Sequence, residues 1–348
     1  MRTKCLGIIV IFLISLIGSV LPCQAATPTI PSKEPTPSSQ PTIKIRMSYP
    51  HGAKSGIGIT EQLFATEVEK RAKGSIKIEH YWNSELGSGK KSLDAIKVGA
   101  LEGGCITPGD FAGYWRNADI MGMTYLWKSA EHYYKVMLSP FGVSFTKQIE
   151  EAVGGVKIVG WPFSGFKNLW NTKVAVKEPK DLKGLKMRVF STSDCRAFFK
   201  ANGALPVEFT FSEVYEGMKM GALDGADESQ GLLRVDKFWE AAKYYAKTEH
   251  LLTQNALVIS KKTWDLISPD VQKIMMDVGK DIFSMKTVPI SLDEYNQGMD
   301  IIKKHGTTIT DVNKELFIES ARKYGWPITR DKVDKNVFDN FVKVVGEM

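Results

Sequence analysis

The acidic pair Asp227 and Glu228 and five scattered histidines are the first residues to test for chemistry in this chain. Two adjacent carboxylates can act as paired acid and base in a cleft enzyme, such as a secreted hydrolase or lyase. The histidines lack the spacing of a zinc site, and we find no dinucleotide-binding GxGxxG, Walker loop or GxSxG elbow. We therefore predict that the protein is not an enzyme. The histidines are His51, His80, His132, His250 and His305.

Composition narrows the class of protein further. The 348 residues are 43% hydrophobic and 24% charged, which is typical of a soluble folded chain and allows about two domains. The net charge of +7 comes from 46 Lys and Arg against 39 Asp and Glu, and no basic run is longer than a pair. This spread argues against a nucleic-acid footprint and favours an acidic small ligand or an anionic surface nearby.

The N-terminus has the pattern of a secretory signal peptide. Arg2 and Lys4 precede an apolar run that ends at Leu21, and small residues follow, so we predict a signal over residues 1–25. The alternative is a lipoprotein anchored through Cys23, although Leu21 and Pro22 depart from the lipidation motif. Residues 26–42 are rich in Pro, Ser and Thr and should form an extended tether. The protein is therefore expected in the periplasm.

Two cysteines remain in the folded body, Cys105 and Cys195. Export permits a disulfide between them. We favour two buried free thiols, because buried cysteines commonly pack as small apolar side chains.

Apolar periodicity predicts an α/β fold. Strands are expected at 43–47, 76–79 and 104–107, with helices at 59–72 and around 93–98 between them. Strands that alternate with helices indicate a parallel sheet with crossover helices. A long helix should run from Ser268-Pro269 to about Lys304, with Pro289 as its point of kinking.

An internal echo indicates two lobes of similar build. The segment 97–103, KVGALEG, recurs at 219–225 as KMGALDG, and each copy ends a predicted helix before a strand or loop. Two lobes imply a cleft between them, where small ligands usually bind. We assign residues 43–163 and about 253–292 to the first lobe, and residues 164–252 and about 293–348 to the second.

The mature chain resembles the extracytoplasmic solute receptors of tripartite ATP-independent periplasmic (TRAP) transporters. The resemblance implies a two-lobe Venus-flytrap fold with a long helix across both lobes. It also implies capture of a small organic acid in the periplasm and delivery to TRAP permease subunits in the membrane. The matching segments are GSIKIE (74–79), SELG (84–87), GALEG (99–103), TPGDFAG (107–113), YLW (125–127), PKDLKGLKMRV (179–189), GALPV (203–207), FSEVY (211–215), GALDGA (221–226), Trp264 and LISP (266–269).

The resemblance also implies which residues bind the acid. Arg188 takes the position that grips the ligand carboxylate, for which a planar guanidinium is well suited; the alternative is a salt bridge to Asp224 or Asp227. Lys167 is the candidate second contact, or else an exposed lysine at a strand edge. Asp227 matches an acidic position of the family, whereas Glu228 replaces an Asn or Trp.

Glu228 leaves the nature of the ligand open. A carboxylate there would repel the ligand's own carboxylate unless a proton, a cation or Arg188 intervenes. Asp227 and Glu228 could hold a Ca²⁺ or Na⁺ ion that bridges to the acid, as in some relatives. Glu228 could instead accept hydrogen bonds from the ligand, or point away from the site.

The remaining site candidates lie at expected strand ends and crossings. Tyr49, His51, Asp110 and Tyr114 fall where cleft loops should be. Phe166 and Trp170 could stack on a ligand, and for Trp170 we favour a core position. His250 and Asn255 flank the expected return crossing between lobes.

We expect a monomeric receptor whose lobes close on the acid. Hinges should lie near residues 162–166 and 250–256 and within the long helix. A receptor that feeds a sensor instead of a permease is the alternative within the same fold.

Overall fold

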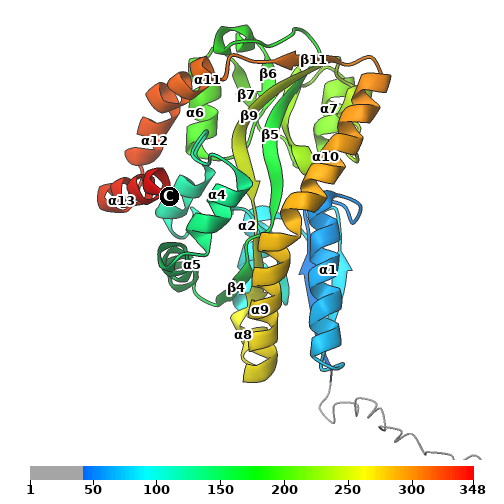
Figure 1. Cartoon of the computed structure of the whole chain (residues 1–348), viewed down its shortest axis with the longest axis vertical. Helices are drawn as coiled ribbons and strands as arrows, with labels where there is room; N and C mark the ends of the chain where they lie inside the picture. Colours follow the sequence, from blue (N-terminus) through cyan, green and yellow to red (C-terminus); the bar gives the residue numbers. More distant parts are fainter. Residues whose placement is uncertain (1–41) are drawn as a thin grey trace, which may run out of the picture. The chain divides into compact units, whose positions relative to one another are not determined.

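Two β-sheets organise the part of the chain that the computed structural model describes, residues 42–348 (Figure 1). The predicted signal peptide, Cys23 and all but the last residue of the tether lie outside this range. The first sheet has the order β2-β1-β3-β10-β4. Its strands are β1 (Ile43–Ser48), β2 (Ile76–Tyr81), β3 (Gly103–Ile106), β4 (Val156–Gly160) and β10 (Ala256–Ser260).

The first sheet is parallel where the sequence predicted it. Strand β1 pairs in parallel with β2 and β3, and helices α1 (Gly56–Arg71) and α2 (Gly89–Val98) make the connections. Strand β10 runs antiparallel to both β3 and β4, so the sheet as a whole is mixed. No local pattern indicates this pairing, because β10 enters the sheet from a distant part of the chain.

The second sheet has the order β11-β9-β5-β8-β6-β7. Two of its strands connect the lobes, since Phe163 and Leu252 belong to the core of the first lobe while Leu169 and Leu251 belong to that of the second. The strands are β5 (Phe163–Asn171), β6 (Lys186–Arg188), β7 (Leu205–Val207), β8 (Gly225–Ser229), β9 (Tyr244–Gln254) and β11 (Thr308–Asp311).

Helices cover both sheets, and short 3-10 turns connect many of the elements. The remaining helices before the long pair are α3 (Pro108–Phe111), α4 (Ala130–Met137), α5 (Pro140–Val153), α6 (Ser193–Ala201), α7 (Val214–Lys219) and α8 (Lys261–Trp264). The 3-10 turns are η1 (Arg116–Gly122), η2 (Pro179–Leu182), η3 (Phe211–Glu213), η4 (Gln230–Leu232) and η5 (Phe238–Glu240).

The predicted long helix is two helices, α9 (Pro269–Met285) and α10 (Thr287–Lys304), separated at Lys286. Together they span both lobes, because α9 packs in the first-lobe core and Ile302 of α10 in the second (Figure 1). The break precedes Pro289 by three residues. Proline lacks an N–H, and its ring clashes with the carbonyl four residues earlier, here that of Met285. The helix is therefore interrupted at that point.

The internal echo corresponds to equivalent structure in the two lobes. Gly99 after α2 and Gly221 after α7 are both left-handed, with φ of 75° and 74°. Strands β3 and β8 then begin at Gly103 and Gly225. A Cβ atom at Gly225 would overlap the carbonyl oxygen of Trp170, so the neighbouring strand approaches too closely for any other residue.

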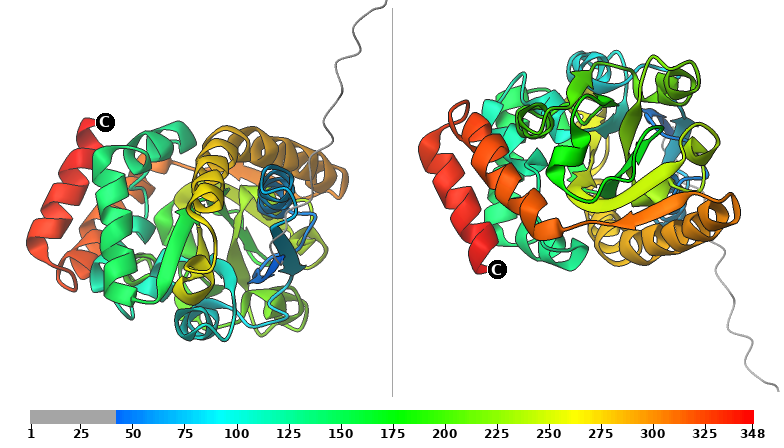
Figure 2. Two further views of the ribbon diagram at one scale, coloured as in Figure 1. Left: turned by 90° about the horizontal axis from the view of Figure 1, so that it is seen from below. Right: turned by 90° about the horizontal axis from the view of Figure 1, so that it is seen from above.

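The C-terminal helix differs from the expected division into lobes. Helix α13 (Lys335–Glu347) lies beside α4 and α5 and packs Phe338, Phe341 and Val345 into the first-lobe core (Figures 1 and 2). The sequence had placed residues 293–348 in the second lobe as one block. The segments before α13 do pack on the second lobe: α11 (Lys314–Ser320) against β9, and the π-helix η6 (Ala321–Gly325) and α12 (Trp326–Arg330) against α6.

Cys105 and Cys195 are free and buried, which confirms the prediction of two buried thiols. Between residues 42 and 348, no helix has the length and apolar character needed to cross a membrane.

Candidate ligand-binding site

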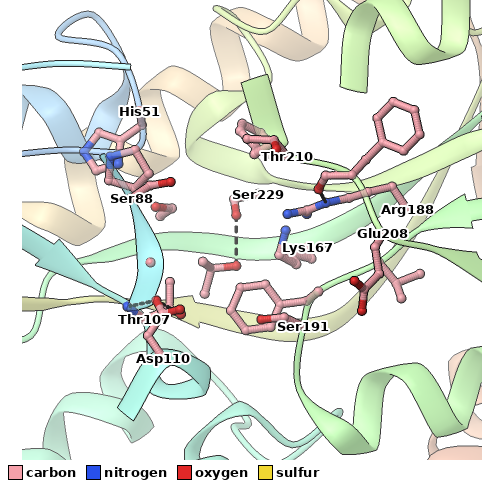
Figure 3. A pocket seen from close by; sticks show the side chains of 18 of the residues that line it. His51, Ser88, Thr107, Asp110, Lys167, Arg188, Ser191, Glu208, Thr210 and Ser229 are labelled. Atoms are coloured by element: carbon pink, nitrogen blue, oxygen red, sulfur yellow. Dashed lines mark hydrogen bonds between the residues drawn. The ribbon is translucent and has the colours of Figure 1, made fainter. Parts of the chain in front are cut away.

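A cleft of about 600 Å³ is lined by loops and strand ends of both lobes (Figure 3). This size suits a small organic molecule, since ligand pockets typically enclose about 300–1,000 Å³. The first lobe contributes residues that follow β1 and β3, and the second lobe contributes strand residues and the loop after β7. Lining residues include His51, Ser88, Thr107, Asp110, Lys167, Arg188, Phe190, Ser191, Glu208, Thr210, Ser229, Thr253 and Asn255.

Arg188 enters the cleft from the carboxyl end of β6. This strand pairs in parallel with β7 and β8, and the pairing fixes the position of the Arg188 backbone. The Arg188 side chain is 15% exposed. Its Nη1 lies 3.3 Å from Oδ1 of Asp227, and its carbon lies 5.3 Å from the centre of the Phe211 ring. The salt bridge that was the alternative role for Arg188 is therefore present, and it leaves part of the guanidinium facing the cleft.

Lys167 is buried on β5 and lines the same cleft. Its Nζ lies 3.3 Å from Oδ1 of Asp227 and 5.2 Å from the centre of the Phe190 ring. Burial lowers the pKa of Lys167, and the attraction of Asp227 offsets part of that effect. Lys167 is thus a charged group of the cleft floor and not an exposed strand-edge lysine.

Asp227 anchors both cations from beneath the cleft surface. It is fully buried, and its Oδ2 accepts a hydrogen bond from the Phe190 N–H at 2.9 Å. Burial alone would raise the pKa of Asp227, but Lys167, His250 and Arg188 together lower it below the ordinary value. Asp227 is not among the residues that line the cleft, so its role is to position Lys167 and Arg188.

Glu228 points to the opposite face of β8, because neighbouring residues of a strand alternate. Its Oε2 accepts a hydrogen bond from Trp170 Nε1 at 2.6 Å, and it does not line the cleft. Burial and the nearby Asp236 raise its pKa, and burial raises the pKa of Asp236 to about 7. The structure therefore does not bring Asp227 and Glu228 together, either as a metal pair or as an acid–base pair.

His250 lies beneath the cleft in a bulge of β9. Lys167 pairs with Leu251 and Leu169 with Ala246, so one residue of β5 opposes four residues of β9. His250 Nε2 lies 3.7 Å from Asp227 Oδ2, and burial lowers its pKa. Bulges commonly redirect side chains at functional sites; this one places His250 behind the carboxylate rather than in the cleft.

Two predicted first-lobe residues line the cleft, His51 and Asp110. His51 Nε2 lies 2.6 Å from Oε2 of Glu61. Asp110 Oδ2 accepts hydrogen bonds from the backbone N–H and the hydroxyl of Thr107 at 3.1 and 2.7 Å. Burial raises the pKa of Asp110.

The other aromatic candidates stand outside the lining. Tyr49 is buried and stacks on Trp82 with ring centres 4.4 Å apart. Phe166 packs against the first-lobe core, and Trp170 is fully buried, as favoured from the sequence. The Tyr114 hydroxyl donates a hydrogen bond to Asp94. Asn255, which the sequence placed near the crossing between lobes, does line the cleft.

Sequence reasoning missed the hydroxyl side chains of the cleft. Six serines and threonines that had not been considered face it: Ser88, Ser164, Ser191, Thr210, Ser229 and Thr253. Strand alternation could have found Ser229, which lies two residues beyond Asp227 on the same face of β8. Ser229 donates its hydroxyl to Thr253 at 2.9 Å, across two strands that are distant in sequence.

Comparison with known proteins identifies the family. The family model for DctP, described as bacterial extracellular solute-binding protein, family 7, matches residues 47–326. A solute-binding protein of Verminephrobacter eiseniae (strain EF01-2) is 27% identical over 283 residues, which cover 81% of this chain and 83% of the relative. The 2,3-diketo-L-gulonate-binding periplasmic protein YiaO of Escherichia coli (strain K12) is 25% identical over 311 residues, 89% and 90% of the two chains.

Solved structures share the fold. A TRAP periplasmic solute-binding protein from Sulfitobacter sp. NAS-14.1, crystallised with β-D-galacturonate, has a TM-score of 0.80 at 23% identity. The match covers 88% of this chain and 100% of the other. Because the family model matches most of the folded chain, the chain belongs to the DctP family, family 7 of the bacterial extracellular solute-binding proteins.

Proposed function

We propose that the cleft captures a small organic acid whose carboxylate is held directly by Arg188 and Lys167. One observation carries this proposal: the two cations share a single buried carboxylate, that of Asp227. The group of three therefore has one positive charge in excess at the cleft floor. An anionic ligand supplies the missing charge.

The chemistry of the two cations suits a carboxylate. A guanidinium presents paired donors that match two carboxylate oxygens, and charge-assisted hydrogen bonds strengthen when water is excluded. Asp227 pre-orients both cations, so less entropy is lost when the acid binds. The serine and threonine hydroxyls of the cleft supply partners for further oxygens of the ligand.

The relatives support an acid as the ligand class. YiaO is named for 2,3-diketo-L-gulonate, and the Sulfitobacter protein holds galacturonate; both compounds are carboxylates. Direct capture by two cations requires no Ca²⁺ or Na⁺ ion at Asp227 and Glu228, whose side chains lie on opposite faces of β8.

Lobe closure is the mechanism we infer for delivery. An acid that contacts both lobes stabilises the closed state by its higher affinity for that state, and the TRAP permease subunits then recognise it. A single chain provides both walls of the cleft, which supports a monomeric receptor. Export to the periplasm would follow from cleavage after Ala25, with a lipid anchor at Cys23 as the alternative.

Native mass spectrometry of the purified protein tests the proposal, followed by denaturing release of any bound compound. We expect one carboxylic acid per chain. Arg188→Ala should weaken its binding by about 2–5 kcal/mol, the usual cost of removing one partner of a buried charge pair. Arg46→Ala is the matched control, because Arg46 pairs with Glu102 outside the cleft lining.

Two results would contradict the proposal. Undiminished affinity in Arg188→Ala would remove Arg188 from the site. Turnover of the released acid by the protein would point to a cleft enzyme instead, because a receptor returns its ligand unchanged.

A further inference from the structure

Three potential metal ligands of different chemistry converge in the wall of the first lobe. One ligand atom from each of His51, Glu61 and Cys105 lies within 4.8 Å of the other two. All three residues are buried. They combine a nitrogen, an oxygen and a sulfur donor, so the group differs from an ordinary acidic cluster.

The fold brings these residues together from three neighbouring elements. His51 follows β1, and Cys105 lies on β3, which pairs in parallel with β1. Glu61 comes from α1, the helix that covers these strands. The N-terminus of this helix is fixed by Ser55, whose hydroxyl accepts a hydrogen bond from the Gly58 N–H at 3.1 Å. Rigid elements thus hold Glu61 and Cys105, and His51 lies in the loop directly after β1.

Glu61 has an unused ligand atom at the centre of the cluster. It is fully buried, and its Oε2 lies 2.6 Å from His51 Nε2. Its Oε1, also buried, has no hydrogen-bond partner among the described residues. A buried carboxylate oxygen without a partner is costly, and a bound cation is one way to satisfy it.

We propose that His51, Glu61 and Cys105 form a site for a divalent transition-metal ion, with Zn²⁺ the best match to the donor set. Zn²⁺ takes histidine nitrogen, carboxylate oxygen and thiolate sulfur, and three protein ligands leave a fourth position open. Cys105 binds as a thiolate and releases its proton to solvent, so the thiolate and the Glu61 carboxylate balance the two charges of the ion. The His51–Glu61 hydrogen bond gives way to two metal bonds.

A second cluster, Cys195 with Asp227 and His250, is the weaker candidate. Its ligand atoms also lie within 4.8 Å of one another. However, Asp227 already faces Lys167 and Arg188 and accepts a hydrogen bond from the Phe190 N–H. Two cations beside this carboxylate repel a third, whereas Glu61 has only His51 as an ion-pair partner among the described residues.

The first-lobe site faces the ligand cleft. His51 and Cys105 line it, and His51 lies across the cleft from Lys167 and Arg188 (Figure 3). The open coordination position can therefore accept an oxygen of an acid whose carboxylate is held on the opposite wall. Metal binding itself does not depend on the proposed capture of an acid, and the two are measured separately.

The test titrates the purified protein, reduced and freed of metal with a chelator, with Co²⁺ as a spectroscopic substitute for Zn²⁺. No organic acid is added. We expect one Co²⁺ per chain, a thiolate-to-metal charge-transfer band in the near ultraviolet, and loss of that band when Zn²⁺ displaces Co²⁺. Cys105→Ser should abolish the band. Glu61→Gln and His51→Gln should each weaken Zn²⁺ binding at least about tenfold. Loss of a residue that only supports a metal ligand already costs about that much, and loss of a ligand itself should cost no less.

Cys195→Ser is the matched control, since it removes the other buried thiol and should keep the band. The proposal is overturned if the wild-type protein binds no Co²⁺, or binds it without a thiolate band. It is also overturned if the band survives Cys105→Ser and disappears in Cys195→Ser. The wild-type and Cys195→Ser spectra decide between these outcomes even if another variant fails to fold.

Discussion

Lys167 and Arg188 approach the same atom, Oδ1 of Asp227, at 3.3 Å each. The residues come from strands β5 and β6, which lie on either side of β8 in the second sheet. A carboxylate between two cations cannot neutralise both, and the excess charge lies where the cleft begins. The affinity for an acid is therefore linked to the stability of the empty receptor.

Removal of the shared carboxylate should destabilise the empty protein more than the loaded one. Asp227→Asn leaves two cations close together, and breaking a buried ion pair costs about 3–5 kcal/mol. A bound acid replaces part of the lost negative charge. Urea unfolding without the acid should show this full loss in the free energy of unfolding. The loss should be smaller when the protein is saturated with the acid that was isolated from the native protein.

A surface ion pair provides the control for Asp227→Asn. Asp277 pairs with Lys273 on α9 outside the cleft lining, and its side chain is about half exposed. Asp277→Asn should change the free energy of unfolding by less than about 1 kcal/mol. An equal loss for Asp227→Asn with and without the acid would show that the ligand does not contact this charge cluster.

The affinity for the acid should fall at alkaline pH through Lys167. Burial lowers the pKa of Lys167, so this lysine loses its proton at lower pH than an exposed one. Calorimetric titration between about pH 7 and 10 should show the acid bound less tightly as pH rises. Lys167→Arg should flatten the profile, because a guanidinium stays protonated throughout. A Lys167→Arg profile as steep as that of the wild type would assign the effect to another group.

The stability of the folded state should decrease from acidic to neutral pH through Glu228 and Asp236. Burial raises the pKa of both in the folded protein, that of Asp236 to about 7. The folded state thus holds these protons more tightly than the unfolded chain. This advantage is complete below about pH 4 and is lost as pH rises through the folded pKa. Each tenfold difference in proton affinity between the two states contributes about 1.4 kcal/mol to the free energy of unfolding.

Glu228→Gln isolates this contribution. It removes one titrating group, so the decrease in stability between about pH 5 and 8 should become smaller. Part of the slope should remain, because burial also raises the pKa of Asp194 to about 7. Unfolding curves that fall just as steeply with pH in Glu228→Gln would exclude Glu228 as a source.

Substitution by alanine should destabilise the protein much more at Gly225 than at Gly221, the two glycines that follow α7. At Gly221 a Cβ meets no atom within 4 Å, so the cost is that of its positive φ, about 1 kcal/mol. At Gly225 the Cβ overlaps the backbone of Trp170. Thermal unfolding should show Gly225→Ala as much the less stable variant, and similar melting temperatures would contradict the close strand approach.

The sequence predicted the features that depend on local patterns. Alternation at residues 43–47 located β1, Ser268-Pro269 located the start of α9, and the repeated glycines located equivalent turns in both lobes. The cations of the cleft, in contrast, were found through the family resemblance. Nothing near Arg188 or Lys167 in the chain indicates that they share a carboxylate.

Long-range pairing accounts for what could not be predicted. The antiparallel entry of β10 depends on strands about 100 and 150 residues away in the chain. Glu228 was a site candidate because it follows Asp227 in the sequence, yet strand alternation sends the two side chains to opposite faces of β8. The bulge that buries His250 likewise arises from the register between β5 and β9.

The place of α13 has a consequence for how the protein is made. Phe338, Phe341 and Val345 complete the core around α4 and α5, so the first lobe lacks part of its core until these residues have been synthesised. Contacts this distant in sequence form slowly. The first lobe therefore completes its core only after residue 345 has been synthesised, by which point every strand of the second sheet has already been made.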